Sequence, residues 1–244
     1  MLKKIREFYN SIRINKKNKM PLLPKEEVPI TFVKIFHKEY PRLAQVELPR
    51  NKDNGELEEV IKSRKSNRHF STNSLDITDL SKLLEGCQIN EREGYFERRA
   101  YPSAGARFPV EIYPIVFNVA GLDRGAYHFN SNKNCLELLL NKDLTEISED
   151  FVSPFIKNPA LAIVMTSVIS RAEVKYGLKA YPFSLIEAGH IAQNISLLSA
   201  KYNIGCCAIG GFIDETISDI LDLSSDEIPI YSLAFGKVEE GQNE

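Results

Sequence analysis

Pro182 to Tyr202 reads PFSLIEAGHIAQNISLLSAKY and carries the longest helical pattern in the chain. Its apolar residues occupy most sides of the predicted helix, which is typical of a helix at the centre of a core or at a subunit interface. The polar residues Glu187, His190 and Asn194 are spaced by three and four, so they share one stripe. On a buried helix, we interpret His190 as a hydrogen-bonded core histidine rather than as a catalyst.

Strand patterns surround this helix without a regular alternation of strand and helix. The run 161–168 is continuously apolar and rich in β-branched residues, as expected of a strand buried on both faces. Because βαβ units do not recur, we predict an α+β fold with a mainly antiparallel central sheet flanked by helices. The other strands are expected at 111–119, 126–130, 135–140 and 229–235, the first three of them as a meander.

Helix ends and loops are predicted from capping residues and glycines. Thr78 is the expected N-cap of a helix over 80–87. Gly205, just past the long helix, is interpreted as its stop signal. The segment 88–105 is expected to be a loop. Further helices are expected near 57–61 and 216–221.

The first 55 residues differ in character from the rest. The first twenty carry seven Lys or Arg against one Glu, and their apolar residues fit one face of a short amphipathic helix. Prolines recur between 21 and 55 and predict an extended segment that crosses the surface of the domain. We therefore predict a basic, proline-rich arm (1–55) and one compact domain (56–244). We favour a solvated arm that rests on the body over a role in binding membranes or acidic partners.

The composition excludes several classes of partner. With 244 residues, 43% of them hydrophobic, the chain can bury a sizeable core, and its formal net charge of −2 gives no field that would gather nucleic acid. No stretch approaches the roughly 18 consecutive apolar residues of a spanning helix, and the N-terminus has no signal-peptide pattern. We expect a cytoplasmic protein without nucleic-acid partners or membrane spans. The cysteines form no Cys-x-x-Cys pair and predict reduced, mostly packed thiols and no metal site: Cys87, Cys135, Cys206 and Cys207.

Three separate stretches have the residue types that hold a flat, phosphorylated ligand. In 64–68 (RKSNR), arginine forks, a lysine and a hydroxyl suit a phosphate group. In 99–106 (RAYPSAGA) and 205–212 (GCCAIGGF), small residues let backbone N–H groups approach a ligand. Each stretch also has a plainer interpretation: a solvated charged face, an ordinary turn and tight packing. No Gly-x-Gly-x-x-Gly follows a strand, which disfavours a Rossmann nucleotide site.

These stretches belong to a longer ordered set of short motifs. The set is Arg64-Lys65-Ser66-x-Arg68, Arg99-x-x-Pro102-Ser103-Ala104-Gly105-Ala106, Gly125-x-Tyr127-His128-Phe129, Lys175-Tyr176-Gly177, Glu187-Ala188-Gly189-His190-x-x-Gln193-Asn194, Gly210-Gly211-Phe212 and Ala234-x-Gly236. In this order it resembles the nitroreductase-like flavoprotein superfamily over about residues 57 to 237. The closer resemblance is to the SagB-type branch, azoline dehydrogenases that work with cyclodehydratases on ribosomal peptides.

The resemblance implies the nitroreductase-like fold with FMN at a homodimer interface. The first motif would contact the phosphate, the ribityl chain and the pyrimidine edge, the second would line one side of the flavin, and the two glycines would approach the ring with their backbone. In relatives a basic residue near the C-terminus also meets the phosphate; here only Lys237 is available, and acidic residues follow it. The implied cofactor residues are Arg64, Lys65, Ser66, Arg68, Pro102, Ser103, Ala104, Gly105, Gln193, Asn194, Gly210, Gly211 and Lys237.

The same branch implicates a Lys-Tyr pair in catalysis, which maps onto Lys175 and Tyr176. Conversion of an azoline to an azole removes a carbon-bound proton and a hydride, so the chemistry needs a general base beside an electron acceptor. Arg171 and Lys179, one helical turn to either side, are cations that would favour a neutral lysine. The alternative is that Lys175 is a helix-surface cation paired with Glu173.

The resemblance therefore implies an FMN-dependent oxidoreductase that oxidises azolines on a ribosomally made peptide, as a homodimer that works with a cyclodehydratase complex and a precursor peptide. Two alternatives stay open. A general NAD(P)H-dependent nitro or quinone reductase would share the fold and FMN without needing the Lys-Tyr pair. A flavin-less docking subunit of a peptide-modifying complex would use the fold as a surface, and the basic arm favours it.

Overall fold

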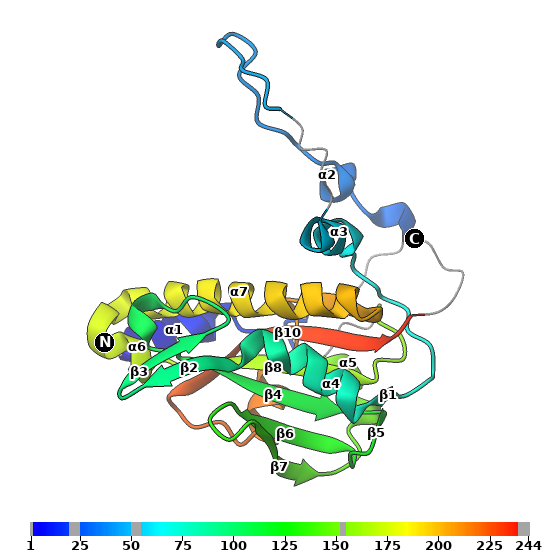
Figure 1. Ribbon diagram of the computed structural model, residues 1–244, viewed down its shortest axis with the longest axis vertical. Helices are drawn as coiled ribbons and strands as arrows, with labels where there is room; N and C mark the ends of the chain where they lie inside the picture. Colours follow the sequence, from blue (N-terminus) through cyan, green and yellow to red (C-terminus); the bar gives the residue numbers. More distant parts are fainter. Residues whose placement is uncertain (1, 20–24, 50–54, 152–154, 239–244) are drawn as a thin grey trace.

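The centre of the computed structural model, which describes residues 2–19, 25–49, 55–151 and 155–238, is a six-stranded sheet in the order β7-β6-β4-β8-β10-β9 (Figure 1). Each neighbouring pair in it is antiparallel. The predicted α+β fold with a mainly antiparallel central sheet is confirmed, as is the meander of β4, β6 and β7. The strands are β4 (Val110–Val116), β6 (Gly125–Asn130), β7 (Cys135–Asn141), β8 (Leu161–Val168), β9 (Ile204–Ile209) and β10 (Glu227–Lys237).

Strand β8 lies between β4 and β10, and its side chains alternate between two cores. Leu161, Ile163 and Met165 belong to the core on one face of the sheet. Ala162 and Val164 belong to the core on the opposite face. Both faces are covered, which is why the sequence here is continuously apolar rather than alternating.

Helix α7 (Ala180–Lys201) lies along one face of the sheet (Figure 1). Its inward residues Ala188, Ile191 and Ile195 share a core with helix α4 (Ile77–Leu84). Helix α8 (Asp214–Ile220) contributes Ile217 to the core on the other face. Among the described residues, no helix has the length and apolar character needed to cross a membrane.

The long helix begins and ends differently from the prediction. It starts two residues before Pro182, which is tolerated because a first-turn N–H has no intrahelical partner. It ends where Asn203 adopts a φ of 54°, a left-handed conformation that asparagine tolerates. Gly205 is therefore not the stop signal: it lies inside β9, where a Cβ would stand 2.8 Å from the ring of Phe70.

Two further expectations were wrong. The N-cap of α4 is Asp76, whose carboxylate accepts from the backbone N–H groups of Thr78 and Asp79 at 2.8 and 2.9 Å. Thr78 itself lies inside the helix, because aspartate is at least as good a cap and precedes it. The predicted loop 88–105 contains an antiparallel hairpin of β2 (Ile89–Glu93) and β3 (Phe96–Arg99). Its residues are mostly polar and exposed, so no apolar alternation indicated strands.

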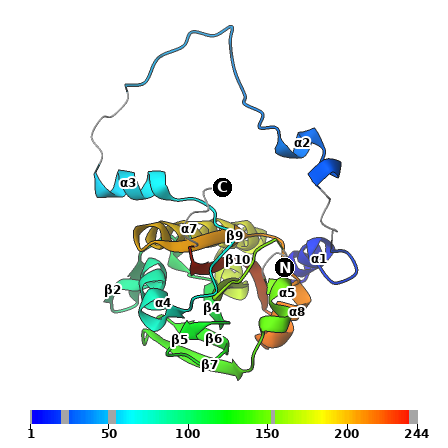
Figure 2. The ribbon, with the colours of Figure 1, turned by 90° about the vertical axis from the view of Figure 1, so that its right-hand side faces the viewer.

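The N-terminal arm has two parts. Helix α1 (Leu2–Ile12) rests on the body through the buried side chains of Ile5 and Tyr9, and the Tyr9 hydroxyl donates to Asp214 Oδ1 at 2.7 Å. Residues 25–49 instead project away from the body in Figures 1 and 2. The expected crossing of the domain surface is wrong for this described part. Its exposed large apolar side chains include Ile30, Phe32, Val33, Ile35 and Phe36.

Short elements complete the fold. A parallel pair joins β1 to β5, and α3 precedes the first basic motif along the chain. These elements are α2 (Ile30–Val33), α3 (Glu56–Ser63), α5 (Ser148–Phe151), α6 (Ser170–Tyr176), β1 (Leu75–Asp76), β5 (Val119–Ala120), and the 3₁₀ turns η1 (Lys25–Glu27), η2 (Glu85–Cys87), η3 (Ala104–Ala106), η4 (Thr145–Ile147) and η5 (Gly177–Lys179).

Candidate functional site

The basic stretch 64–68 follows α3 and runs beside β9. Arg64 is the C-cap of α3, and the backbone N–H of Asn67 donates to the carbonyl of Cys206 at 2.8 Å. Burial raises the pKa of the Cys206 thiol to about 11, and the nearby charge of Arg64 opposes that shift. The structure therefore brings together the first and third predicted stretches. The side chains of this motif that are exposed to solvent are Lys65, Ser66 and Arg68.

Phe70 fixes the basic stretch to the sheet. Its side chain is fully buried, and it packs against Gly205 of β9 and Gly236 of β10, which are register partners. A Cβ on Gly236 would stand 2.6 Å from Phe70 Cβ. The two glycines are therefore needed for close packing, which was the plainer interpretation of Gly205.

Lys237, the predicted C-terminal phosphate ligand, has an acidic partner. Its Nζ donates to Asp79 Oδ2 at 2.6 Å, and the Asp79 side chain is largely buried. This ion pair ties the end of β10 to α4. A phosphate at Lys237 would have to compete with that carboxylate.

Gly210 and Gly211 lie exposed just beyond β9. A Cβ on Gly210 would meet no heavy atom of the described residues within 4 Å, so this side of its backbone is open in the described part of the chain. The following turn is braced by the arm: the N–H of Ile14 donates to Asp214 Oδ2 at 2.8 Å, and the N–H of Asp214 donates to the carbonyl of Ile14 at 3.1 Å. A Cβ on Gly211 would meet only Ile14 Cδ1, at 3.7 Å, among the described residues, and the role of both glycines toward a flavin stays a prediction.

The second predicted stretch forms a strained loop. Gly105 has φ 59°, and the non-glycine residues Ala106 and Phe108 have φ 52° and 45°. Left-handed backbone at a non-glycine residue costs about 1 kcal/mol or more. The loop is held by local bonds, since the N–H of Phe108 donates to Ser103 Oγ at 2.9 Å and that of Ala106 to the Ser103 carbonyl at 3.1 Å. Strain of this kind concentrates at functional sites.

The structure places the predicted catalytic pair against this loop. A Cβ on Gly105 would stand 2.6 Å from Lys175 Nζ and in collision with the Tyr176 hydroxyl. The Tyr176 ring is fixed edge-on against Phe183, with centroids 5.1 Å apart. In this arrangement a side chain at position 105 would displace the ends of both side chains. Helix α6 and the loop, separated by about 70 residues of sequence, therefore meet at one point.

A charged network ties α6 to the sheet and to the loop. Arg171 forms an ion pair with Glu111 and donates to the carbonyl of Phe108 at 3.2 Å. His128 lies between Glu111 and Glu137, with each ring nitrogen 3.0 Å from a carboxylate oxygen. The bond to Glu111 is the main cause that raises the pKa of His128. The network fixes the helix that carries Lys175.

The polar residues of α7 differ in their burial and in their hydrogen bonds. The Asn194 side-chain amide donates to the carbonyls of Gly86 and Ala100 at 3.2 and 3.0 Å, so it braces the backbone before the strained loop. Gln193 and His190 are exposed. The prediction of a core histidine is wrong, because His190 lies on the side of α7 that the protomer leaves uncovered.

Glu187 belongs to the polar stripe and to a motif of the long helix, but the sequence indicates no role for it. It is 2% exposed, and its Oε2 has no hydrogen-bond partner among the described residues. Burial raises its pKa to about 7, opposed chiefly by a hydrogen bond from Ser103. A buried carboxyl beside a strained loop is typical of a functional site. The signal in the sequence was a glutamate on a helix that is otherwise apolar on most sides.

Helix α7 links two groups of predicted residues. Glu187 lies beside the strained loop, whereas Ser196 Oγ is 3.7 Å from Cys206 Sγ, next to the basic stretch. Nine residues of helix separate these points, about 14 Å along the axis. The loop and Lys175 lie near the first half of α7, and the basic stretch lies near its second half.

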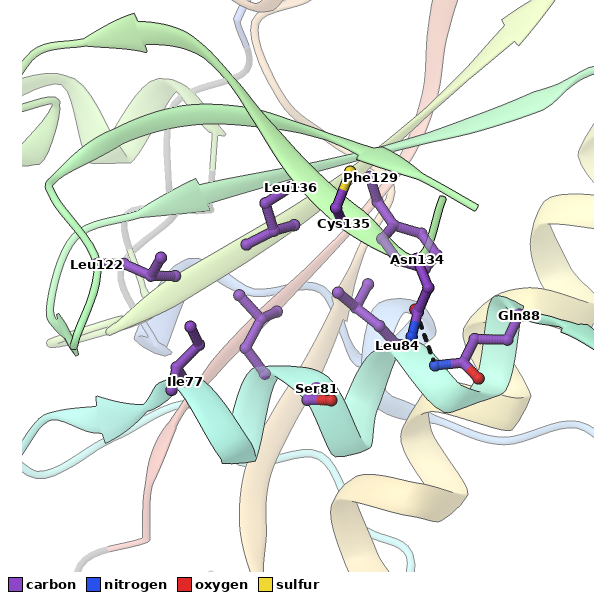
Figure 3. Close-up of a pocket in the computed structure, with 10 residues that line it drawn as sticks. Ile77, Ser81, Leu84, Gln88, Leu122, Phe129, Asn134, Cys135 and Leu136 are labelled. Carbon is purple, nitrogen blue, oxygen red and sulfur yellow. Dashed lines mark hydrogen bonds between the residues drawn. The ribbon is translucent and has the colours of Figure 1, made fainter. Parts of the chain in front are cut away.

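A separate apolar pocket of about 360 Å³ lies between α4 and the β6–β7 hairpin (Figure 3). Gln88 Nε2 donates to Asn134 Oδ1 at 3.2 Å at one end of it. None of its lining residues belongs to the predicted cofactor or catalytic set. They are Ile77, Leu80, Ser81, Leu84, Gln88, Leu122, Phe129, Asn134, Cys135 and Leu136.

The cysteines are free, and three of them are buried, as predicted; Cys135 is exposed. Burial raises the pKa of Cys87 to about 12. Buried thiols with raised pKa values are inert packing groups rather than nucleophiles.

Comparison with known proteins finds similarity to the nitroreductases and to a peptide-processing protein. The profile of the Nitroreductase family matches residues 61–237. MJ1384 of Methanocaldococcus jannaschii, named after the nitroreductases, is 27% identical over 187 residues, 74% of this chain and 90% of MJ1384. The microcin B17-processing protein McbC of Escherichia coli is 24% identical over 176 residues, 69% of this chain and 64% of McbC. A chain of the E. coli microcin synthetase McbBCD complex with truncated pro-MccB17 bound has a TM-score of 0.80 at 19% identity, over 98% of this chain and 93% of that one.

Proposed function

This chain belongs to the nitroreductase family, a family of oxidoreductases, and on that premise we propose that it is an FMN-dependent dehydrogenase that oxidises azoline rings to azoles on a ribosomally made peptide. The observation that carries the proposal is the meeting of Lys175 and Tyr176 with Gly105. A general reductase has no need of a lysine and a phenol fixed at one backbone position. The likeness to the peptide-processing protein McbC supports the same choice.

The residues present suit FMN. Exposed cations and a hydroxyl in 64–68 would hold the single phosphate and the ribityl chain. The open space beside Gly210 would let backbone N–H groups approach a flat ring, which a side chain there would hinder. When bound, FMN supplies a two-electron acceptor. Lys237 is the weakest member of the proposed set, because Asp79 already neutralises it.

In the proposed reaction the ring loses one carbon-bound proton and one hydride. Lys175 would take the proton at Nζ, and the hydride would leave with the electron pair of the broken bond to the cofactor. The Tyr176 hydroxyl, on a ring that packs edge-to-face with Phe183, would orient the lysine or the ring nitrogen. Arg171, paired with Glu111, places a guanidinium group on the helix that carries the base.

A homodimer with FMN between the subunits is part of the proposal. The outward side of α7 exposes Leu185 and Ile186, which are 40% and 56% exposed, together with Gln193. Burying that side against a second copy would cover apolar surface on a helix that has little polar face. A precursor peptide and a cyclodehydratase complex are the proposed partners, and the fold shared with a chain of the McbBCD complex supports them.

The test begins with the purified protein. We expect a yellow protein whose released ligand has the mass of FMN rather than FAD, and which removes two hydrogens from a thiazoline or oxazoline peptide, as seen by mass spectrometry. Flavin loading with NAD(P)H-dependent reduction of a nitroaromatic, and no azoline turnover, would instead establish the general reductase. A colourless protein that takes up no added FMN would establish the docking subunit.

A further inference from the structure

Two arginines form a crossed pair of hydrogen bonds between the strained loop and α6. Arg107 Nε donates to the carbonyl of Arg171 at 2.7 Å, and Arg171 Nη1 donates to the carbonyl of Phe108 at 3.2 Å. Each segment therefore gives one side chain and one carbonyl to the other. We call Arg107 and Arg171 the crossed arginine pair.

Helix α6 has little apolar packing of its own. It is seven residues long, and Ala172 is its one buried residue. Val174 is 77% exposed. A helix this short is not stable by itself in water, so contacts with other segments decide where it lies.

The contacts that hold α6 are mainly polar. At its start the N–H of Ser170 donates to Asp226 Oδ1 at 3.1 Å. The ion pair of Arg171 with Glu111 joins the helix to β4. The crossed arginine pair joins it to the loop 103–108. The sheet and the loop are therefore linked to the helix by separate bonds.

Arg107 bonds to the helical turn that carries Lys175. In a regular α-helix the carbonyl of residue 171 also accepts from the N–H of residue 175, about 6 Å along the axis. In the loop, Arg107 follows Gly105 by two residues. A Cβ on Gly105 would stand 2.6 Å from Lys175 Nζ. The bond of Arg107 is thus close, on both segments, to the contact on which the proposed function rests.

The backbone on both sides of Arg107 is strained. Ala106 and Phe108 have φ of 52° and 45°, and such conformations persist only where surrounding contacts determine them. The Phe108 ring centroid lies 4.4 Å from the Arg99 guanidinium, and the Phe108 carbonyl accepts from Arg171. The bonds to α6 therefore oppose the tendency of the loop to relax.

The side chain of Arg107 has one task in the described part of the chain. It is exposed, and among the described residues its guanidinium hydrogen-bonds only to the carbonyl of Arg171. Arg171, by contrast, also pairs with Glu111. Arg107 can therefore be replaced without cutting the link between α6 and the sheet.

We propose that Arg107 is a positioning residue: by holding the carbonyl of Arg171 it sets the distance between the loop and α6, and so keeps Lys175 at Gly105. The inference rests on the proposed function, because the place of Lys175 affects a reaction only if this lysine is the base. Loss of Arg107 should slow the chemical step and leave substrate binding unchanged.

The first test is amide hydrogen exchange of peptides covering 169–177 in the full-length, FMN-treated protein. Arg107→Met keeps an unbranched stem and removes the donors, so exchange in α6 should become roughly three- to tenfold faster, the effect of losing one ordinary hydrogen bond. Arg107→Lys keeps a charged donor on a long stem and should restore most of the protection. Unchanged exchange in Arg107→Met would overturn the inference.

The second test is steady-state turnover of a thiazoline peptide. In Arg107→Met, kcat should fall about 10- to 100-fold, because a displacement of about 1 Å costs up to this much. KM should stay at the wild-type value, and Arg107→Lys should recover most of kcat. A raised KM with an unchanged kcat would make Arg107 a substrate-binding residue and would overturn the inference. So would an Arg107→Lys enzyme as slow as Arg107→Met.

The control is Arg124→Met, which removes another exposed arginine, paired with Asp143 outside the proposed site. It should match the wild type in exchange, kcat and KM, and equally fast α6 exchange in this variant would overturn the inference. Exchange needs no turnover. A wild-type protein inactive on azolines would refute the proposed function, whereas the exchange of the Arg107 variants would still decide whether Arg107 holds α6.

Discussion

Replacement of Glu187 by glutamine should change how stability depends on pH. The pKa of this carboxyl is raised by burial from 4.5 to about 7 in the folded protein. A raised pKa means that the folded state binds the proton more tightly, so this group favours folding most below pH 4.5 and loses that contribution as the pH rises through 7. Full ionisation removes up to about 3 kcal/mol from the free energy of unfolding. Glutamine has nearly the same shape and no charge to bury.

The measurable quantity is the difference in unfolding free energy between variant and wild type. It should grow in favour of the variant by about 2.5 kcal/mol between pH 5 and pH 8. Urea unfolding followed by circular dichroism, at one protein and one FMN concentration, measures it at both ends. Any fixed effect of the buried amide cancels, because it is the same at every pH. A difference that stays constant over this range would show that Glu187 is ionised and satisfied in the folded protein.

Three further predictions concern other positions. Lys175→Ala should keep FMN but lower azoline turnover by roughly 10²- to 10⁴-fold. Arg68→Ala should instead lose FMN first and regain activity when excess FMN is added. If the Lys175→Ala variant turns over at the wild-type rate, Lys175 is not the base. Phe70→Ala should lower the free energy of unfolding, measured in urea, by about 3 to 5 kcal/mol, because the ring is fully buried against two strands. A loss under about 1 kcal/mol would contradict this packing. Ile186→Glu should turn a dimer into a monomer that holds less flavin, and light scattering that shows an unchanged dimer would exclude the α7 interface.

The sequence by itself determined the elements whose signal is local. Period and composition within one segment predicted β8 and α7. Burial on both faces of a strand leaves a continuous apolar run, and burial of most of a helix leaves apolar residues on most of its sides. The absence of βαβ alternation predicted the α+β class. The ordered motifs named the residues that the family would use, including Lys175, Gly105 and Arg64.

The predictions that were wrong depended on residues whose presence in a sequence can have two physical reasons. Gly205 as a helix stop and Gly205 as a packing residue look alike in the sequence, and only the ring of Phe70 above it distinguishes them. Thr78 and Asp76 are both good N-cap residues, and the helix begins after the earlier one, Asp76. His190 looked buried because the helix is apolar, yet it lies on the side of α7 that the protomer leaves uncovered.

The tertiary structure alone decided which distant residues meet. No local pattern indicates that Lys175 reaches Gly105, or that Glu187 accepts from the N–H of Val110. The charge state of Glu187 is likewise a property of the fold, because desolvation depends on everything that packs around a group and not on its neighbours in the chain. The sequence supplied the chemical groups of the site, and packing set their distances and their protonation.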